Sequence, residues 1–251
     1  MSLMEFPHAE SGNCADITFE GDQVIKTSKW GLSYEDAVAE HDALLSYAGA
    51  LAQEPIEVAT LRSASLVTDQ GLYHVRHATD VVYGESVLSL RGDERQAAVA
   101  QIANGISAMS TVDNPDRMYV GVDGTVKNWH MGPDGQPILI DLFPPLVRNN
   151  DGELKVGAIP GNYAHYERYL GTKSGVLTKM LFSAHNDNYP ALSPKDCVRQ
   201  VVKGADSWCY DVLPTDMDPV VKDGVRSELR LRFTPFLGST MVRKVRNKRA
   251  G

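Results

Sequence analysis

The sequence is poor in cysteine and has no long apolar run. Its 251 residues include only three cysteines, at positions 14, 197 and 209, and their spacing matches no metal-ligand pattern. This sparse use of cysteine fits a reducing compartment, so we expect a cytoplasmic protein. No stretch approaches the ~20 apolar residues that cross a membrane. The N-terminus lacks the basic and apolar regions of a signal peptide, and we therefore expect no membrane association.

Positive charge is also scarce. Lysine and arginine total 25 against 32 aspartate and glutamate residues, which gives a net charge of −7. This balance argues against non-specific binding to nucleic acid, so we expect no nucleic-acid partner. A short basic run at residues 243–249 is interpreted as a solvated terminus. The composition, 43% hydrophobic and 23% charged, is ordinary for a globular protein with a sizeable core, and it leaves the oligomeric state open.

The stretch from Asp123 to Pro145 holds the most informative group of polar side chains. Residues 129–131 and 138–140 read as two short strands, and the turn between them contains Pro133 and the pair Asp134-Gly135. A hairpin brings its two ends together, so Asn128 and Asp141 should emerge side by side. One amide oxygen and one carboxylate at the same mouth suit Mg²⁺ that carries phosphates.

A third polar side chain is delivered to this mouth. Asp123 lies five residues before Asn128 and follows a short extended run at residues 119–122. Pro144 and Pro145 keep Asp141 out of a regular helix or strand. We place the chemistry of the protein here.

The N-terminal region predicts a hairpin followed by a helix. Residues 12–20 and 23–27 read as antiparallel strands, with Lys26 near the end of the second. Ser33 is a candidate N-cap for the helix. Its apolar positions are Ala37, Val38, Leu44, Leu45, Ala48 and Leu51. Glu40 falls either on the buried face, where it needs a cation such as Lys26, or at the solvated edge of the apolar stripe. Lys26 itself has the alternative reading of a solvated strand end.

The type of secondary structure changes near residue 80. A five-stranded sheet and one helix are expected before it, and mostly helices after it. The expected later helices cover residues 93–111, 162–170, 175–185, 194–202 and 219–231. We therefore predict an α+β fold with two parts, residues 1–79 and residues 80–251.

The order of these features resembles the protein-kinase-like superfamily. A strand lysine, a helix glutamate, a D-x-x-x-x-N loop, a short hairpin and an aspartate after an apolar strand follow one another over about residues 12–145. The chain looks most like the branch of aminoglycoside phosphotransferases and small-molecule kinases. This resemblance implies a bilobal fold, with a small antiparallel-sheet N-lobe and a mostly helical C-lobe.

The resemblance also implies roles for individual residues. Lys26 matches the lysine that holds the α- and β-phosphates of ATP, and Glu40 matches the glutamate that positions it. Asp123 matches the catalytic aspartate that faces the acceptor hydroxyl. Asn128 and Asp141 match the two Mg²⁺ ligands.

The nucleotide base is expected to meet the chain at a linker. Residues 76–79, with Arg76, His77 and Ala78, match the hinge that contacts adenine through backbone groups.

The chain departs from the family pattern at three points. Gly121 stands where the family usually has a histidine that supports the catalytic loop. Asp141 is followed by Leu142-Phe143 rather than by Phe-Gly, and Gly12 is the only glycine of the nucleotide-covering loop. The first departure puts the geometry of the loop in question rather than its proton chemistry.

The function implied is an ATP- and Mg²⁺-dependent O-phosphotransferase. Its acceptor would be a hydroxyl of a small molecule, such as an aminoglycoside-like antibiotic or another natural product, bound by the helical half. The chain contains no G-x-S-x-G and no H-E-x-x-H motif that would indicate another chemistry. Two alternatives remain: a kinase-like nucleotide-binding module without activity (a pseudokinase), and an unrelated α+β protein in which the motif order is accidental.

Overall fold

A computed structural model of the chain has an α+β fold with an antiparallel sheet and several helices. It describes residues 15–142, 146–149, 151–156, 163–186 and 212–228. Several sequence-based expectations lie outside the described residues: those on Gly12, on the three cysteines, on Pro144 and Pro145, on the helix at 194–202 and on the basic run at 243–249.

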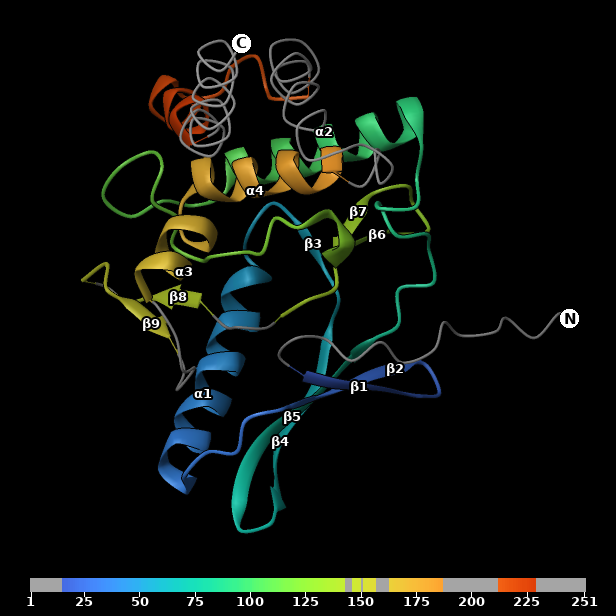
Figure 1. Cartoon of the computed structure of the whole chain (residues 1–251), viewed down its shortest axis with the longest axis vertical. Coiled ribbons are helices and arrows are strands. Elements are labelled where there is room, and N and C mark those ends of the chain that lie inside the picture. The colour runs from blue at the N-terminus through green and yellow to red at the C-terminus, as the bar shows by residue number, and fades with distance from the viewer. Residues whose placement is uncertain (1–14, 143–145, 150, 157–162, 187–211, 229–251) are drawn as a thin grey trace, which may run out of the picture.

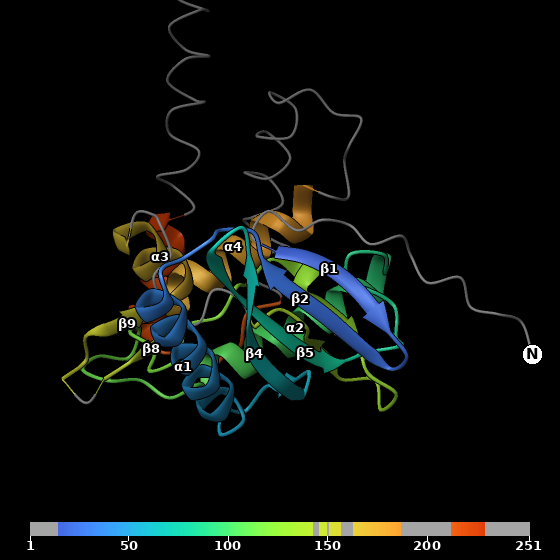
Figure 2. The same cartoon turned by 90° about the horizontal axis from the view of Figure 1, so that it is seen from below.

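The main sheet has four antiparallel strands in the order β1-β2-β5-β4. Their bounds are β1 (Ala15–Glu20), β2 (Gln23–Ser28), β4 (Leu61–Asp69) and β5 (Leu72–Asp80). Tight turns join β1 to β2 and β4 to β5, and Gly21 and Gly71 adopt positive φ angles of 63° and 82° in them. Figure 1 shows this sheet at one end of the molecule, and Figure 2 shows its face with α1 beside it.

The first helix, α1 (Tyr34–Leu51), begins where the sequence predicts. The hydroxyl of Ser33 accepts a hydrogen bond from the Asp36 amide at 3.1 Å, as an N-cap does. Its buried face consists of Ala37, Glu40, Leu44, Tyr47 and Leu51. Leu45, expected on this face, is 45% exposed, and Tyr47 lies on it instead.

The fifth N-terminal strand leaves the main sheet, so the expectation of a five-stranded sheet is wrong. β3 (Glu57–Val58) pairs in parallel with β7 (Pro137–Leu139), and the Ala59 amide continues this pairing with a hydrogen bond of 2.8 Å to the Leu139 carbonyl. Two residues of strand carry no pattern that distinguishes one sheet from another. The partner of β3 is therefore set by the tertiary fold.

The central hairpin agrees with its prediction to within one residue. β6 (Trp129–Met131) pairs with β7 in antiparallel register, with Trp129 opposite Leu139. The turn is closed by a hydrogen bond of 2.8 Å from the Gly132 amide to the Gln136 carbonyl, and Gly135 has a φ of 74°. The short 3-10 helix η1 (Val126–Asn128) leads into β6.

A second hairpin follows in a region where mostly helices were expected. β8 (Leu146–Arg148) pairs with β9 (Leu154–Val156), and Gly152 in the turn has a φ of 77°. The α-helices described after residue 80 are α2 (Gly92–Ala108), α3 (Tyr163–Leu170), α4 (Lys173–Asn186) and a helix at residues 219–228.

One hydrophobic core joins the sheet to the helices. It runs from Leu44 and Tyr47 of α1 and Val75 of β5 to Ile102 of α2 and Leu177 of α4, all of which are buried. Figure 1 shows α2 and α4 side by side at the end of the molecule opposite the main sheet. None of the described helices combines the length and the apolar character needed to cross a membrane.

Candidate functional site

The ammonium group of Lys26 meets the carboxylate of Asp141 across the fold. Lys26 Nζ lies 2.8 Å from Asp141 Oδ1 and donates a second hydrogen bond of 3.0 Å to the Ile140 carbonyl. The Lys26 side chain is 8% exposed and that of Asp141 is 28% exposed. β2 supplies the cation, and the segment directly after β7 supplies the anion. The alternative reading of Lys26 as a solvated strand end is therefore wrong.

His77 lies directly beside this pair. It is the register partner of Lys26 in the pairing of β2 with β5, and it is buried. Burial and then the charge of Lys26 lower the pKa of His77 to about 4, although Asp141 opposes them. His77 is therefore neutral at pH 7 and adds no second positive charge to the site.

The hairpin brings residues 128 and 141 to the same end, as the sequence predicts. The Ile140 amide donates a hydrogen bond of 2.9 Å to the Asn128 carbonyl. Asp141 is the next residue after this cross-strand contact. Asn128 is 8% exposed. The ligand role of these two residues stays a prediction.

Asp123 is held at the entrance to this hairpin by three donors. Its Oδ1 accepts hydrogen bonds from the Thr125 amide at 2.9 Å and the Thr125 hydroxyl at 2.6 Å, and Lys179 Nζ of α4 lies 2.8 Å away. Burial on its own raises the pKa of Asp123, but Lys179 and the Thr125 hydrogen bonds outweigh it, so the pKa is lowered. Asp123 is therefore ionised at neutral pH.

The backbone of the two residues before Asp123 is held by hydrogen bonds to three other elements. The Gly121 amide donates to the Leu146 carbonyl of β8 at 2.9 Å, and the Val122 amide donates to the Leu170 carbonyl of α3 at 2.9 Å. The hydroxyl of Tyr47 in α1 donates to the Gly121 carbonyl at 2.7 Å. Three elements thus fix the position from which Asp123 projects.

Gly121 is required by the space around it rather than by its backbone angles. A Cβ atom there would lie 2.6 Å from the Leu170 carbonyl oxygen and 2.9 Å from Leu146 Cβ. No side chain fits at this position without moving its neighbours. The histidine that the family resemblance expects here is therefore excluded by packing.

Substitution of Gly121 by alanine is expected to lower the free energy of unfolding by about 2 kcal/mol, because the added methyl group overpacks the loop. Gly49 occupies an exposed position of α1, and a methyl group added there would have no neighbouring atom within 4 Å. Gly49→Ala is the matched control and is expected to stabilise by about 0.5–1 kcal/mol. Urea unfolding measures both values, and equal effects of the two substitutions would contradict the packing argument.

A buried arginine anchors the same backbone run from its other side. The side chain of Arg148 is fully buried and donates to the carbonyls of Met118 at 2.8 Å, Gly152 at 3.1 Å and Gly171 at 3.4 Å. It also lies 3.2 Å from Glu167 Oε1 of α3. These contacts tie β8, α3 and the segment before Gly121 into one unit.

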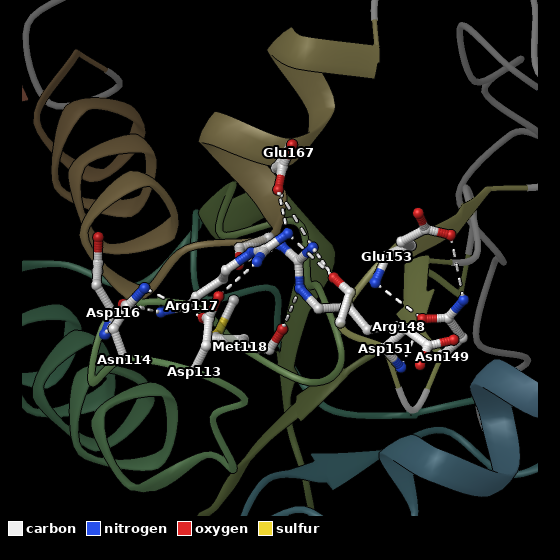
Figure 3. A network of polar contacts seen from close by, with 12 residues as sticks. Asp113, Asn114, Asp116, Arg117, Met118, Arg148, Asn149, Asp151, Glu153 and Glu167 are labelled. Atoms are coloured by element: carbon white, nitrogen blue, oxygen red, sulfur yellow. Dashed lines mark hydrogen bonds and ion pairs between the residues drawn. The ribbon is translucent and has the colours of Figure 1, made fainter.

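Arg117 extends this network toward the surface. Figure 3 shows Arg117 and Arg148 side by side below Glu167. Arg117 donates to Glu167 Oε1 at 3.1 Å, to the Gly152 carbonyl at 3.0 Å and to Asp113 Oδ2 at 2.6 Å. Glu167 therefore accepts from two guanidinium groups that would otherwise repel each other.

The expected hinge residues lie inside the sheet. Arg76, His77 and Ala78 occupy the middle of β5, where they pair with β2 on one side and β4 on the other. The chain leaves the sheet only after Asp80, so the expectation of a linker at residues 76–79 is wrong about its position. Their predicted role as nucleotide-binding residues stays a prediction.

The burial of Glu40 decides between the two readings of its position in α1. Glu40 is fully buried, so the reading that placed it on the buried face of α1 is confirmed and the solvated reading is wrong. Its role in positioning Lys26 stays a prediction.

Tyr47 and Lys179 are the residues that sequence reasoning missed. Tyr47 lies three residues after Leu44 and four before Leu51 on the buried face of α1, and a buried tyrosine needs a partner for its hydroxyl. Lys179 interrupts the buried run of Val176, Leu177, Met180 and Leu181 in α4. A lysine among these residues was the available signal for an anion nearby.

No histidine, cysteine, aspartate or glutamate cluster in the described part of the chain has three members placed to hold a metal ion. The predicted set of Asn128 and Asp141 is smaller than such a cluster. Two ligands are enough for Mg²⁺, which often binds one or two protein oxygens and completes its coordination shell with phosphates and water. The donor chemistry therefore suits Mg²⁺ that arrives with a nucleotide.

A pocket of about 580 Å³ lies away from this site. It is formed by the end of α2, the loop at residues 111–115, Lys173 at the start of α4 and residues 214–221. None of the predicted site residues lines it.

Comparison with protein-family models and with curated proteins finds no match for this chain.

Proposed function

We propose that this protein is an ATP- and Mg²⁺-dependent phosphotransferase that acts on a hydroxyl group of a small molecule. The main support is the contact of 2.8 Å between Lys26 and Asp141, which are 115 residues apart. The family resemblance assigns one of them to the phosphates of ATP and the other to their metal ion. If the resemblance were accidental, nothing would require the segments that carry these two residues to meet.

In this proposal the fold is a bilobal, kinase-like one. The main sheet and α1 form the nucleotide-phosphate side, and the helices after Asp141 form the acceptor side. The adenine linker belongs after Asp80, where the chain leaves the sheet, because the peptide groups of Arg76 to Ala78 are used within it.

The residues of the site then divide the work of phosphoryl transfer. Lys26 carries a positive charge to the α- and β-phosphates, and Asn128 and Asp141 hold Mg²⁺, which neutralises charge on the phosphates. Asp123, ionised at neutral pH, orients the acceptor hydroxyl and accepts its proton. Such a reaction needs positioning and charge more than covalent chemistry, and these four side chains supply both.

Millimolar ATP with Mg²⁺ is expected to raise the melting temperature by about 5–10 °C. A ligand at one hundred times its Kd stabilises by about 2.7 kcal/mol, and in a chain of this size each kcal/mol shifts the melting temperature by about 2–4 °C. Lys26→Met should remove this shift, because the phosphates lose their cation. Differential scanning fluorimetry measures both.

Lys29→Met is the matched control, because Lys29 follows β2 directly and its side chain is 33% exposed. It should leave the nucleotide-dependent shift unchanged. A wild-type protein that shows no shift at millimolar nucleotide would contradict the proposed function. A shift without phosphate transfer to any of a broad panel of hydroxyl compounds would favour the pseudokinase alternative.

A further inference from the structure

Tyr47 connects α1 to the loop that carries Asp123. Its side chain is 2% exposed, and its hydroxyl donates to the buried carbonyl of Gly121 at 2.7 Å. Gly121 and Tyr47 are 74 residues apart, so this contact joins two distant segments. A buried carbonyl that loses its donor costs about 1–3 kcal/mol, which makes this contact more than incidental packing.

The charges of both functional carboxylates act on the Tyr47 hydroxyl. Burial raises the pKa of Tyr47 most, and the charges of Asp141 and Asp123 raise it further. The phenol is therefore protonated at neutral pH and serves as a hydrogen-bond donor. Such a donor is suited to hold the Gly121 carbonyl in place.

The same helix face bears Glu40, seven residues before Tyr47. Seven residues are close to two turns of an α-helix, so the two side chains point in nearly the same direction about 10 Å apart along the axis. Both are buried. One face of α1 thus carries two buried polar side chains, Glu40 and, at the catalytic loop, Tyr47.

We propose that Tyr47 is the positioning residue of the catalytic loop, in place of the histidine that the family resemblance expects at position 121. It acts through the Gly121 carbonyl and holds the backbone two residues before Asp123. This inference rests on the proposed function for its catalytic consequence, and on the described contacts for its structural part. The packing around Gly121 explains why support comes from α1: a side chain at position 121 has no room.

Tyr47→Phe removes one hydroxyl and keeps the ring. The amide hydrogens of Gly121 and Val122, which are bonded to Leu146 and Leu170, should exchange about 10-fold faster in this variant, since a lost hydrogen bond of about 1.4 kcal/mol corresponds to that factor. In a phosphotransfer assay kcat should fall about 10-fold while KM for ATP stays within twofold.

Two controls separate positioning from general destabilisation. Tyr34→Phe removes a hydroxyl from an exposed tyrosine of the same helix and should change neither exchange nor kcat. Leu44→Val weakens the core on the same face of α1 and should lower stability without selective exchange at Gly121 and Val122. These experiments use the full chain well below its melting temperature.

Each result decides one point. Exchange at Gly121 and Val122 that is unchanged in Tyr47→Phe, or equally fast in Leu44→Val, overturns the proposal. A wild-type chain without nucleotide binding or transfer defeats the proposed function alone, because hydrogen exchange still tests the role of Tyr47. Faster exchange with an unchanged kcat overturns the catalytic part of the inference.

Discussion

Replacement of Asp123 by asparagine is expected to lower kcat for phosphate transfer by about 1,000-fold. A positioned general base contributes about 10²- to 10⁴-fold to the rate. Asparagine keeps the shape of aspartate but cannot take up the proton of the acceptor hydroxyl. The amide oxygen can still accept from Thr125, which now bonds Asp123 Oδ1. The loss should therefore appear in kcat, with nucleotide binding measured by thermal shift largely unchanged.

Asp134→Asn is the matched control, because Asp134 is an exposed aspartate in the turn between β6 and β7. It should retain full activity. If Asp123→Asn keeps more than a tenth of the wild-type kcat, the role assigned to Asp123 is wrong.

Lys179→Met tests the Asp123 carboxylate by removing its ion-pair partner. Without the ammonium group 2.8 Å away, the pKa of Asp123 should rise, because the favourable charge is lost and the burial remains. A base must be deprotonated to act, so the acid limb of the rate profile should move to higher pH. An acid limb that does not move would mean that Asp123 is not the titrating base.

Replacement of Arg148 by methionine is expected to be the most destabilising of these substitutions, at about 3–5 kcal/mol. Methionine fills much of the volume of the arginine stem but removes four polar contacts: the carbonyl of Met118 loses its donor, and the carbonyls of Gly152 and Gly171 and the carboxylate of Glu167 each lose one of two donors. A buried acceptor without a donor costs about 1–3 kcal/mol, and the loss of the other contacts of this buried network adds to that cost. Against a typical stability of about 5–15 kcal/mol, the loss amounts to roughly a fifth or more of the total. The melting temperature should fall by about 10 °C.

Arg62→Met is the control for this experiment. Arg62 pairs with Asp80 at the surface of the main sheet, and its side chain is 53% exposed. Because exposed pairs contribute little, the melting temperature should barely change. A similar fall for both variants would show that the burial of Arg148 is not what makes it important.

The features that sequence reasoning located correctly are encoded over short distances. The central hairpin depends on the turn at residues 132–136, and α1 depends on Ser33 and the spacing that follows it. The same local patterns placed Lys26 at the end of a strand and Asp141 just after another. Their direct contact was not predicted, since no local pattern pairs residues 115 apart.

The features that were missed depend on partners far away in the chain. β3 joins the central hairpin rather than the main sheet because Glu57 and Val58 meet Ile138 and Leu139. The hairpin of β8 and β9 is three residues wide on each side, too short for a periodic signal. Tyr47 and Lys179 were visible as polar groups on buried helix faces, but their partners, Gly121 and Asp123, are identified only by the fold.

The pairing of β3 with β7 has a consequence for synthesis on the ribosome. Glu57 leaves the ribosome about 80 residues before Ile138, its register partner. At elongation rates of about 5–20 residues per second, the two strands are separated by roughly 4 to 16 seconds. During this interval the nascent chain can complete the main sheet, whose strands lie within residues 15–80, but it holds β3 without β7 and the Tyr47 hydroxyl without the Gly121 carbonyl. A chaperone at the ribosomal exit would meet the chain in this state.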